Sequence, residues 1–182
     1  MTDFEAEREL FRDGLVERHE TAWRELYARH TPALLRLAQL LADSADDADD
    51  LVHETWLRAV RGAKRFGGRS ALRTWLTGIL VNCAREWRRA ARRAAAVPLD
   101  DEVPASDPEP PAGVERLDLE RAVAALAPGY REVLLLHDLF GYTHDEIGGM
   151  LDLSPGTSKS QLSRARRAMI RALGGGQGGT ND

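Results

Sequence analysis

The residues of this chain with the clearest chemistry lie near its C-terminus, where cations gather and no acid lies among them. The cations between residues 159 and 171 are Lys159, Arg164, Arg166, Arg167 and Arg171. Leu162, Ala165, Met169 and Leu173 recur at i, i+3, i+7 and i+11, which predicts an amphipathic helix with one apolar stripe. A helix with this charge can neutralise DNA phosphates and present side chains to base edges.

The residues just before this helix predict a shorter helix and a tight turn. Thr143 and Glu146 have the spacing of a capping box, in which a hydroxyl and a carboxylate satisfy free amides at a helix start. Asp152 stands where the chain must turn, and Asp tolerates the left-handed conformation. Ser154 can cap the second helix, with Pro155 at its first position. The pattern predicts a DNA-binding helix-turn-helix; the alternative is a helical hairpin with a solvated basic face.

A second candidate surface lies on a helix predicted to follow a turn at residues 43–46 and to end near Arg61. Its apolar face is predicted to point inward, and it comprises Val52, Trp56, Ala59 and Val60. The opposite face has the same helical spacing and comprises Asp50, His53, Glu54 and Leu57. Acids mixed with an exposed leucine are typical of a partner surface, although a solvent face with one stray leucine fits equally well.

A third candidate site combines a glycine-broken loop at residues 65–70 with a basic helix predicted from about Ala71 to Arg93. The loop carries Phe66, and Asn82 lies on the helix. A loop with an aromatic ring beside a basic helix can follow a phosphate backbone and hold unstacked bases. Trp75 lies among apolar residues of the helix and is predicted to belong to the core.

Composition supports a helical protein and excludes several classes of function. Of the 182 residues 30% are charged and 6% are aromatic, and runs of alternating β-branched residues are absent. The net charge of −4 is segregated, because residues 43–54 hold six acids and no Lys or Arg, whereas residues 64–93 hold nine cations and one acid. A DNA partner responds to such local charge rather than to the sum.

No apolar run approaches the roughly 18 residues of a membrane helix, so we expect no membrane insertion. The acidic N-terminus is unlike a secretory signal, and a cytoplasmic location is expected. Cys83 is the single cysteine and is predicted to be a small buried residue.

Enzyme chemistry finds no support in the sequence. His53-Glu54 begins like a zinc-protease motif, but Leu57 occupies the place of the second histidine. The neighbouring pairs His137-Asp138 and His144-Asp145 are expected not to face one another on a helix, and to be surface or capping residues. We therefore expect no catalytic residue, metal, cofactor or small-molecule substrate.

These patterns predict an all-α protein with two small helical domains. Residues 97–113 are acidic and rich in proline, and are predicted to be a flexible linker between domains at 1–96 and 114–173. The glycine-rich residues 174–182 are predicted to be a disordered tail.

Further helices are predicted at residues 15–29, 33–42, 115–126 and 128–140. Pro32 is predicted to open the second of these, and Gly141 to end the last. The core of the second domain is expected to include Val133, Leu134, Leu136 and Leu139.

Four motifs occur in an order that resembles a known family. They are Asp49–Ala59, Ser70–Leu76, Arg131–Leu136 and Gly156–Arg166. Together they resemble a bacterial RNA polymerase sigma factor of the extracytoplasmic-function (ECF) group. The resemblance implies that the first domain is sigma region 2, which binds core polymerase and opens the −10 element. It implies that the second domain is sigma region 4, which recognises the −35 element. Promoter DNA and the β′ and β subunits would be partners, and an anti-sigma factor would control the activity of the chain.

The resemblance also implies residue roles. Docking against β′ is implied for Asp50, His53, Glu54 and Leu57. Capture of the −10 element is implied for Phe66, Arg69, Ser70, Asn82, Arg85, Arg88 and Arg89. Contact with the −35 element is implied for Lys159, Ser160, Gln161, Ser163, Arg164 and Arg167. Among these, Gln161 and Arg164 have the reach for base edges, while Lys159 and Ser160 suit phosphates.

Some positions depart from the family pattern. His53 replaces a usual Gln, and Ser158 and Gln161 replace a usual Val and Arg, so the −35 preference cannot be borrowed from relatives. Gly148 and Gly149 interrupt a helix at about 1 kcal/mol each; Gly148 is expected to permit close packing against the recognition helix, and Gly149 has no evident reason. The rival interpretation is a free-standing transcriptional regulator that binds its operator alone, usually as a dimer. It leaves the basic helix at 85–93 without a role.

Overall fold

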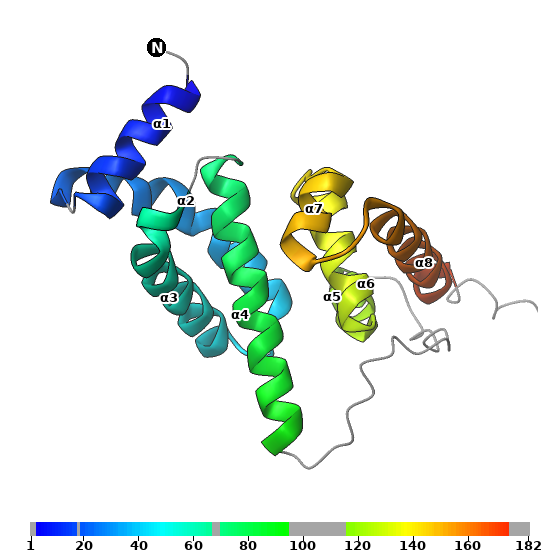
Figure 1. Ribbon diagram of the computed structural model, residues 1–182. Coiled ribbons are helices and arrows are strands. Elements are labelled where there is room, and N and C mark those ends of the chain that lie inside the picture. The colour runs from blue at the N-terminus through cyan, green and yellow to red at the C-terminus, as the bar shows by residue number, and fades with distance from the viewer. Residues whose placement is uncertain (1–2, 18, 67–69, 95–115, 175–182) are drawn as a thin grey trace, which may run out of the picture. The chain divides into compact units, whose positions relative to one another are not determined.

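The computed structural model describes residues 3–17, 19–66, 70–94 and 116–174, and every regular element among them is a helix (Figure 1). The chain divides after Val97 into two compact units, each treated by itself below. The predicted linker at 97–113, the tail after residue 174 and the candidate residue Arg69 lie outside the described residues.

The first unit is a bundle of three long helices preceded by a short one. Helix α1 (Asp3–Phe11) runs into one π-helical segment, η1 (Arg12–Val16). The long helices are α2 (Glu20–Leu41), α3 (Ala45–Gly62) and α4 (Leu72–Ala94), with the 3-10 turn η2 (Ala63–Arg65) after α3. Each long helix packs on the other two (Figure 1), and the core between them includes the fully buried Leu26, Leu37, Leu51, Leu76 and Leu80.

Helix α2 corrects the prediction that Pro32 opens a new helix, because the helix runs unbroken through that residue. A proline inside a helix removes one hydrogen bond and costs about 3 kcal/mol. Tertiary packing offsets this cost, since Leu26 and Leu34 are buried on either side of the proline. The indole Nε1 of Trp56 also donates to Thr31 Oγ1 at 3.0 Å, which ties this part of α2 to α3.

Local signals in the first unit gave mixed results, since the helix predicted at residues 15–29 begins only at Glu20 and Leu15 lies in the preceding segment η1. The Ser44 hydroxyl accepts a hydrogen bond from the Asp47 amide at 3.1 Å, so the predicted turn does cap α3. Cys83 is completely buried, as predicted, and burial raises the pKa of its thiol. Helix α1 was not predicted.

The second unit contains α5 (Arg116–Ala125), α6 (Pro128–Leu134), the π-helical segment η3 (Leu135–Leu139), α7 (His144–Leu151) and α8 (Pro155–Gly174). Helix α8 packs against α5, α6 and α7, so it is held along its apolar side. One part of the core of the second unit comprises Ala122, Leu126, Tyr130, Ala165, Ala168 and Met169.

Segment η3 corrects another expectation. Residues 128–140 were predicted to form one regular helix with Leu139 in the core, yet Leu139 is 61% exposed and Leu134 is only half-buried. The Phe140 amide donates to Leu135 at 3.0 Å, a π-type bond, and the wider turn shifts the register of the residues after it. Leu139 is thereby carried off the buried face. Gly141 ends the segment at φ 72°, as predicted.

Candidate functional site

The helix-turn-helix begins with a complete capping box. The Thr143 hydroxyl accepts from the Glu146 amide at 3.3 Å, and the Glu146 carboxylate accepts from the Thr143 amide at 3.0 Å. Asp152 adopts the left-handed conformation at φ 56° and ψ 50°. The Ser154 hydroxyl then accepts from the Thr157 amide at 3.0 Å at the start of α8. These local predictions are confirmed, and together they set where the cationic helix begins.

The two glycines of α7 differ in their surroundings. A Cβ atom on Gly148 would lie 2.6 Å from the carbonyl oxygen of Leu153, whereas a Cβ on Gly149 would meet nothing within 4 Å. Gly148 therefore lets the turn pass directly against α7. Close packing was expected against the recognition helix, but the tight contact is with the turn residue Leu153, and the Pro155 backbone nitrogen of α8 lies further away, at 3.8 Å. Nothing in the structure explains Gly149.

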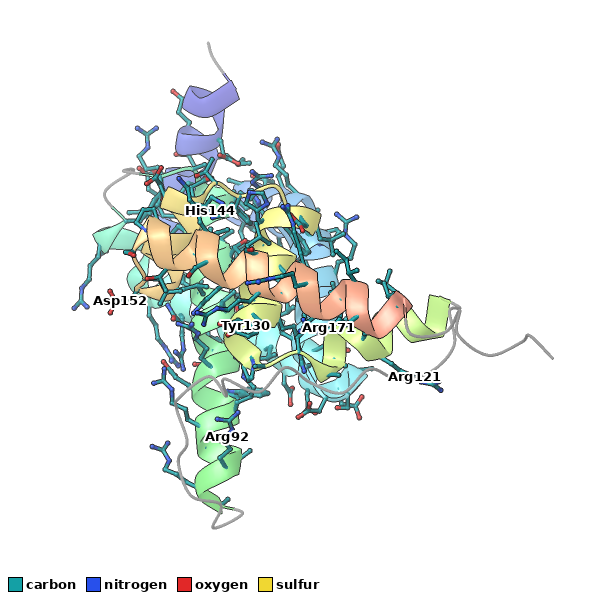
Figure 2. The ribbon with its side chains drawn as sticks, turned by 90° about the vertical axis from the view of Figure 1, so that its right-hand side faces the viewer. Arg92, Arg121, Tyr130, His144, Asp152 and Arg171 are labelled. Atoms are coloured by element: carbon teal, nitrogen blue, oxygen red, sulfur yellow. The ribbon has the colours of Figure 1, made fainter. Side chains whose placement is uncertain are left out.

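Helix α8 exposes most of the residues implied in −35 recognition. The exposed ones are Lys159, Ser160, Ser163, Arg164 and Arg167. Gln161 is half-buried, and its Oε1 is buried without a hydrogen-bond partner. The Ser160 hydroxyl donates to the Thr157 carbonyl at 2.9 Å, and one Arg164 nitrogen lies 3.3 Å from the Tyr130 hydroxyl. Figure 2 labels Asp152 and His144 near the N-terminal end of α8, and Arg171 towards its C-terminal end.

A polar network that the sequence did not reveal joins η3, α7 and α8. His137 and His144 stack with ring centroids 4.6 Å apart, and His144 Nδ1 lies 2.9 Å from the hydroxyl of the fully buried Ser158. His137 Nδ1 lies 2.8 Å from Asp138, whose carboxylate accepts two bonds from Arg166, at 2.9 and 2.5 Å. The expectation that His137 and Asp138 do not interact was therefore wrong.

This network changes proton affinities. The Arg166 guanidinium holds the pKa of Asp138 below its ordinary value. The pKa of His144 is lowered first by burial of its ring and then by the charges of His137, Lys159 and Arg166.

Helix α3 brings the four predicted docking residues onto one surface. Asp50 and His53 are exposed and Leu57 is 37% exposed, while Glu54 is half-buried. The Glu54 carboxylate accepts from Arg58 at 2.7 Å, and Arg58 also donates to Glu86 of α4 at 2.8 Å. This bridge raises the pKa of Arg58 and lowers that of Glu86. Glu54 thus has an intramolecular partner and is half-buried, whereas Asp50 and His53 are exposed.

An open pocket of about 370 Å³ lies between α3 and α4. It is lined by Arg58, Gly62, Arg65, Trp75, Ile79, Asn82 and Glu86. Asn82 is exposed at this pocket, whereas Trp75 is half-buried there rather than in the core as predicted. Of the arginines further along α4, Arg85 and Arg88 are half-buried and Arg89 is exposed.

Phe66 does not lie open to solvent. Its ring centroid is 4.7 Å from that of Trp75 and 4.8 Å from that of Phe11. Ser70, at the other end of the loop, is half-buried. The structure thus brings Trp75 and Asn82 together at one pocket and places the Phe66 ring against Trp75.

Comparison with known proteins decides the family. The family model described as sigma-70 region 2 matches residues 26–94, and the one described as sigma-70 region 4 matches residues 116–169. The chain is also 35% identical over 154 residues to the ECF RNA polymerase sigma factor SigM of Mycobacterium tuberculosis, covering 84% of this chain and 78% of that one. The chain belongs to the ECF group of the sigma-70 family.

Further relatives agree. This sigma factor is 30% identical over 172 residues to the RNA polymerase sigma factor CarQ of Myxococcus xanthus, covering 91% and 95% of the two chains. Two solved structures resemble it at a TM-score of 0.69 and 26% identity. One is RpoE of Bartonella quintana in complex with the anti-sigma factor NepR, covering 84% of this chain and 96% of that one. The other is CnrH in complex with the cytosolic domain of CnrY, covering 93% and 98%.

The family defines the activity. This protein is an alternative sigma factor that directs promoter-specific transcription, and it is not an enzyme. Its two sigma regions imply binding to RNA polymerase and to DNA. Within the described residues, no helix is both long and apolar enough to cross a membrane.

Among the residues that the structure describes, one cluster brings metal-ligating groups together. Ligand atoms of Asp13, Glu17 and His19 lie within 4.8 Å of one another. Arg12 Nε lies 3.3 Å from the Asp13 carboxylate and 3.6 Å from that of Glu17, so both acids already have a cation beside them. We assign no metal there.

Proposed function

We propose that this sigma factor works in the cytoplasm by docking α3 on the β′ subunit of core polymerase. In the same proposal, the α3–α4 pocket captures a −10 base, and α8 recognises the −35 element while the second unit lies against β. One observation carries this proposal: α3 presents an acidic, partly apolar face to solvent while its C-terminal residues line a polar pocket with α4. A single helix can then couple polymerase binding to strand capture.

The α3 surface has the composition of a docking interface. Asp50 adds charge that can orient the encounter with a basic partner, and Leu57 supplies an apolar group that binding can desolvate. The buried side of the same helix includes Leu51 and Trp56, at 2% and 3% exposure, so packing in the core holds this surface in place. His53 lies beside Asp50 on the exposed face.

The α3–α4 pocket suits an unpaired base. Its volume falls within the range of small-molecule sites, roughly 300–1,000 Å³. Trp75 offers an aromatic ring for stacking, and the Asn82 amide offers both a donor and an acceptor for a Watson–Crick edge. Unstacking a base costs a few kcal/mol, which such contacts can offset.

Residues that do not line the pocket are proposed to hold the strand. Phosphate contacts are assigned to Arg69, Ser70, Arg85, Arg88 and Arg89. Phe66 belongs to this site through its stack on Trp75.

The proposed −35 contacts of helix α8 are of two types, with phosphates and with base edges. Lys159, Ser160, Ser163 and Arg167 are assigned to phosphates, and Arg164 to a base edge. Gln161 is assigned to a base edge because its amide can both donate and accept, and its half-buried side chain lies on the same helix as the exposed Arg164.

An anti-sigma factor is the proposed regulator. The similar sigma factors RpoE and CnrH were solved with the anti-sigma factor NepR and the cytosolic domain of CnrY, respectively. By likeness to them, we assign the exposed α3 face, with Asp50, His53 and Leu57, as a surface that such a protein would cover.

Run-off transcription with purified core polymerase tests these roles. We expect Leu57→Asp to weaken core binding by tenfold or more, because it places a charge in a desolvated contact. We expect Asn82→Ala to leave core binding unchanged and to reduce open-complex formation. Lys159→Ala should weaken −35 DNA binding for all sequences and lower the salt slope by about one. The exposed Gln39→Ala on α2 is the matched control.

Two results would contradict the proposal. One is core binding unaffected by Leu57→Asp. The other is specific dimeric binding of the chain alone to duplex DNA, which is the behaviour of a free-standing regulator.

A further inference from the structure

The N-terminal segment of the chain packs against the proposed base pocket although it lies outside the family match. The match to sigma-70 region 2 begins at residue 26, whereas α1 and η1 end at Val16. Phe11 and Leu15 of this segment are nevertheless buried, at 7% and 3% exposure. A segment with buried apolar residues belongs to the folded unit and is not a loose extension.

Phe11 closes a cluster of three aromatic rings. Its ring centroid lies 4.8 Å from Phe66 and 5.8 Å from Trp75, and the Phe66 and Trp75 centroids are 4.7 Å apart. Phe11 meets Trp75 edge to face at 82°. All three separations lie in the favourable range for aromatic pairs, about 4.5–7 Å. Each ring therefore restrains the other two.

The same cluster reaches the pocket through Trp75. Trp75 lines the pocket together with Asn82, and a Cβ atom on Gly62 would lie 3.4 Å from its ring. Phe11 is not among the residues that line the pocket. Phe11 thus contacts Trp75, a residue of the pocket wall, without lining the pocket itself.

The segment that carries Phe11 is itself held firmly on α2. A Cβ atom on Gly14 would lie 2.9 Å from a Leu26 methyl carbon and 3.0 Å from the Trp23 backbone nitrogen, so η1 passes directly against α2. The Glu7 carboxylate also lies 3.3 Å from His30 Nε2 of α2. Phe11 is thereby fixed in place independently of the loop that follows Phe66.

We propose that Phe11 is a positioning residue for base capture: its ring holds Phe66 and Trp75 so that Trp75 forms a preformed stacking wall for the −10 base. This inference rests on the proposed function of the α3–α4 pocket. Because the wall is already ordered, base binding has no entropic cost of ordering it. Loss of Phe11 would add that cost and weaken binding, although Phe11 itself makes no contact with the base.

The test uses the reconstituted holoenzyme and a promoter fragment on which it initiates in run-off transcription. The probe is the non-template −10 strand of that fragment, with 2-aminopurine placed at each position in turn to report unstacking and binding. Variants are Phe11→Ala, Trp75→Ala, the double variant and Asn82→Ala. Leu15→Ala is the matched control, because it truncates another buried residue of the same segment that lies outside the ring cluster.

We expect Phe11→Ala to weaken binding of the probe on the order of tenfold, the loss of two aromatic pairs, with core affinity unchanged. In the Trp75→Ala background the Phe11 substitution should have no further effect, because there is no wall left to hold. Leu15→Ala should leave probe binding within about twofold of the unmodified protein. Phe11→Leu, which keeps most of the apolar volume, provides the same comparison if Phe11→Ala impairs folding.

Several results would overturn the inference. If Asn82→Ala weakens binding of the probe but Phe11→Ala does not, the pocket captures the base and the proposed role of Phe11 is wrong. If Phe11→Ala has its full effect in the Trp75→Ala background, or Leu15→Ala matches it, Phe11 acts only on stability. If Asn82→Ala and Trp75→Ala both leave probe binding unchanged, the pocket does not capture a base and both proposals fall.

Discussion

Replacing Gly148 by alanine should destabilise the second unit, whereas the same change at the adjacent Gly149 should stabilise it. The new methyl group at 148 would lie 2.6 Å from the Leu153 carbonyl oxygen, closer than such atoms approach in folded proteins. That oxygen belongs to the backbone of the turn. The amides of Asp152 and Leu153 both donate to the Gly148 carbonyl, the latter at 3.0 Å, so the turn cannot move without disturbing these bonds.

The magnitude follows from three contributions. Alanine gains about 1 kcal/mol over glycine in a helix interior. Overpacking costs about 1–3 kcal/mol, and a weakened turn hydrogen bond costs about 1 kcal/mol more. Gly148→Ala should therefore lower the free energy of unfolding by about 1–3 kcal/mol, combining these terms. Gly149→Ala meets nothing within 4 Å and should raise it by the propensity gain alone.

Urea and thermal unfolding of the full chain, followed by circular dichroism, measures both variants. Each kcal/mol should shift the Tm of a unit of this size by roughly 4–8 °C. Binding of a −35 duplex to the holoenzyme gives a second measurement, since opening the turn would also tilt α8. If Gly148→Ala proves as stable as Gly149→Ala, the contact with Leu153 does not restrict the turn and the steric argument is refuted.

Three further predictions concern caps, protons and DNA charge. Thr143→Ala should lower the free energy of unfolding by about 1 kcal/mol through loss of the N-cap, measured by urea unfolding. Burial lowers the pKa of His30 below its ordinary value of 6.5, with Glu7 acting in the opposite sense. The unfolded chain therefore takes up this proton first, and the stability of the first unit should fall as pH drops from 6.5 to the lowered value. His30→Gln should flatten that pH profile in unfolding measured from pH 7.5 downwards. Asp138→Asn should loosen the bond to Arg166 and steepen the salt dependence of −35 DNA binding, by up to about one unit of slope.

Local signals along the chain were sufficient for much of the second unit. The capping box at Thr143, the left-handed turn at Asp152 and the Ser154 cap each depend on residues within a few positions of one another. Short-range hydrogen bonds and backbone preferences determine such features, so sequence alone predicts them. The order of four motifs was likewise enough to predict the sigma-70 family, which the comparisons bear out.

Features that depend on distant residues were predicted less well. Pro32 does not break α2, because packing on both sides of it outweighs the lost hydrogen bond. Leu139 lies outside the core because a π-helical segment shifts the register of its helix. Nothing in the local spacing of residues signals that shift. Packing against residues distant in the sequence can therefore override the local preference of a residue for a given secondary structure or a buried position.

The sequence by itself determined which residues could form helices, caps and charged faces, since these follow from side-chain type and spacing over a few positions. Only the tertiary structure decided that the Phe11 ring contacts those of Phe66 and Trp75, and that His144 stacks on His137 and meets Ser158. Such contacts join segments far apart in the chain, and their energy depends on ring separation and burial. Neither quantity exists until the helices have packed.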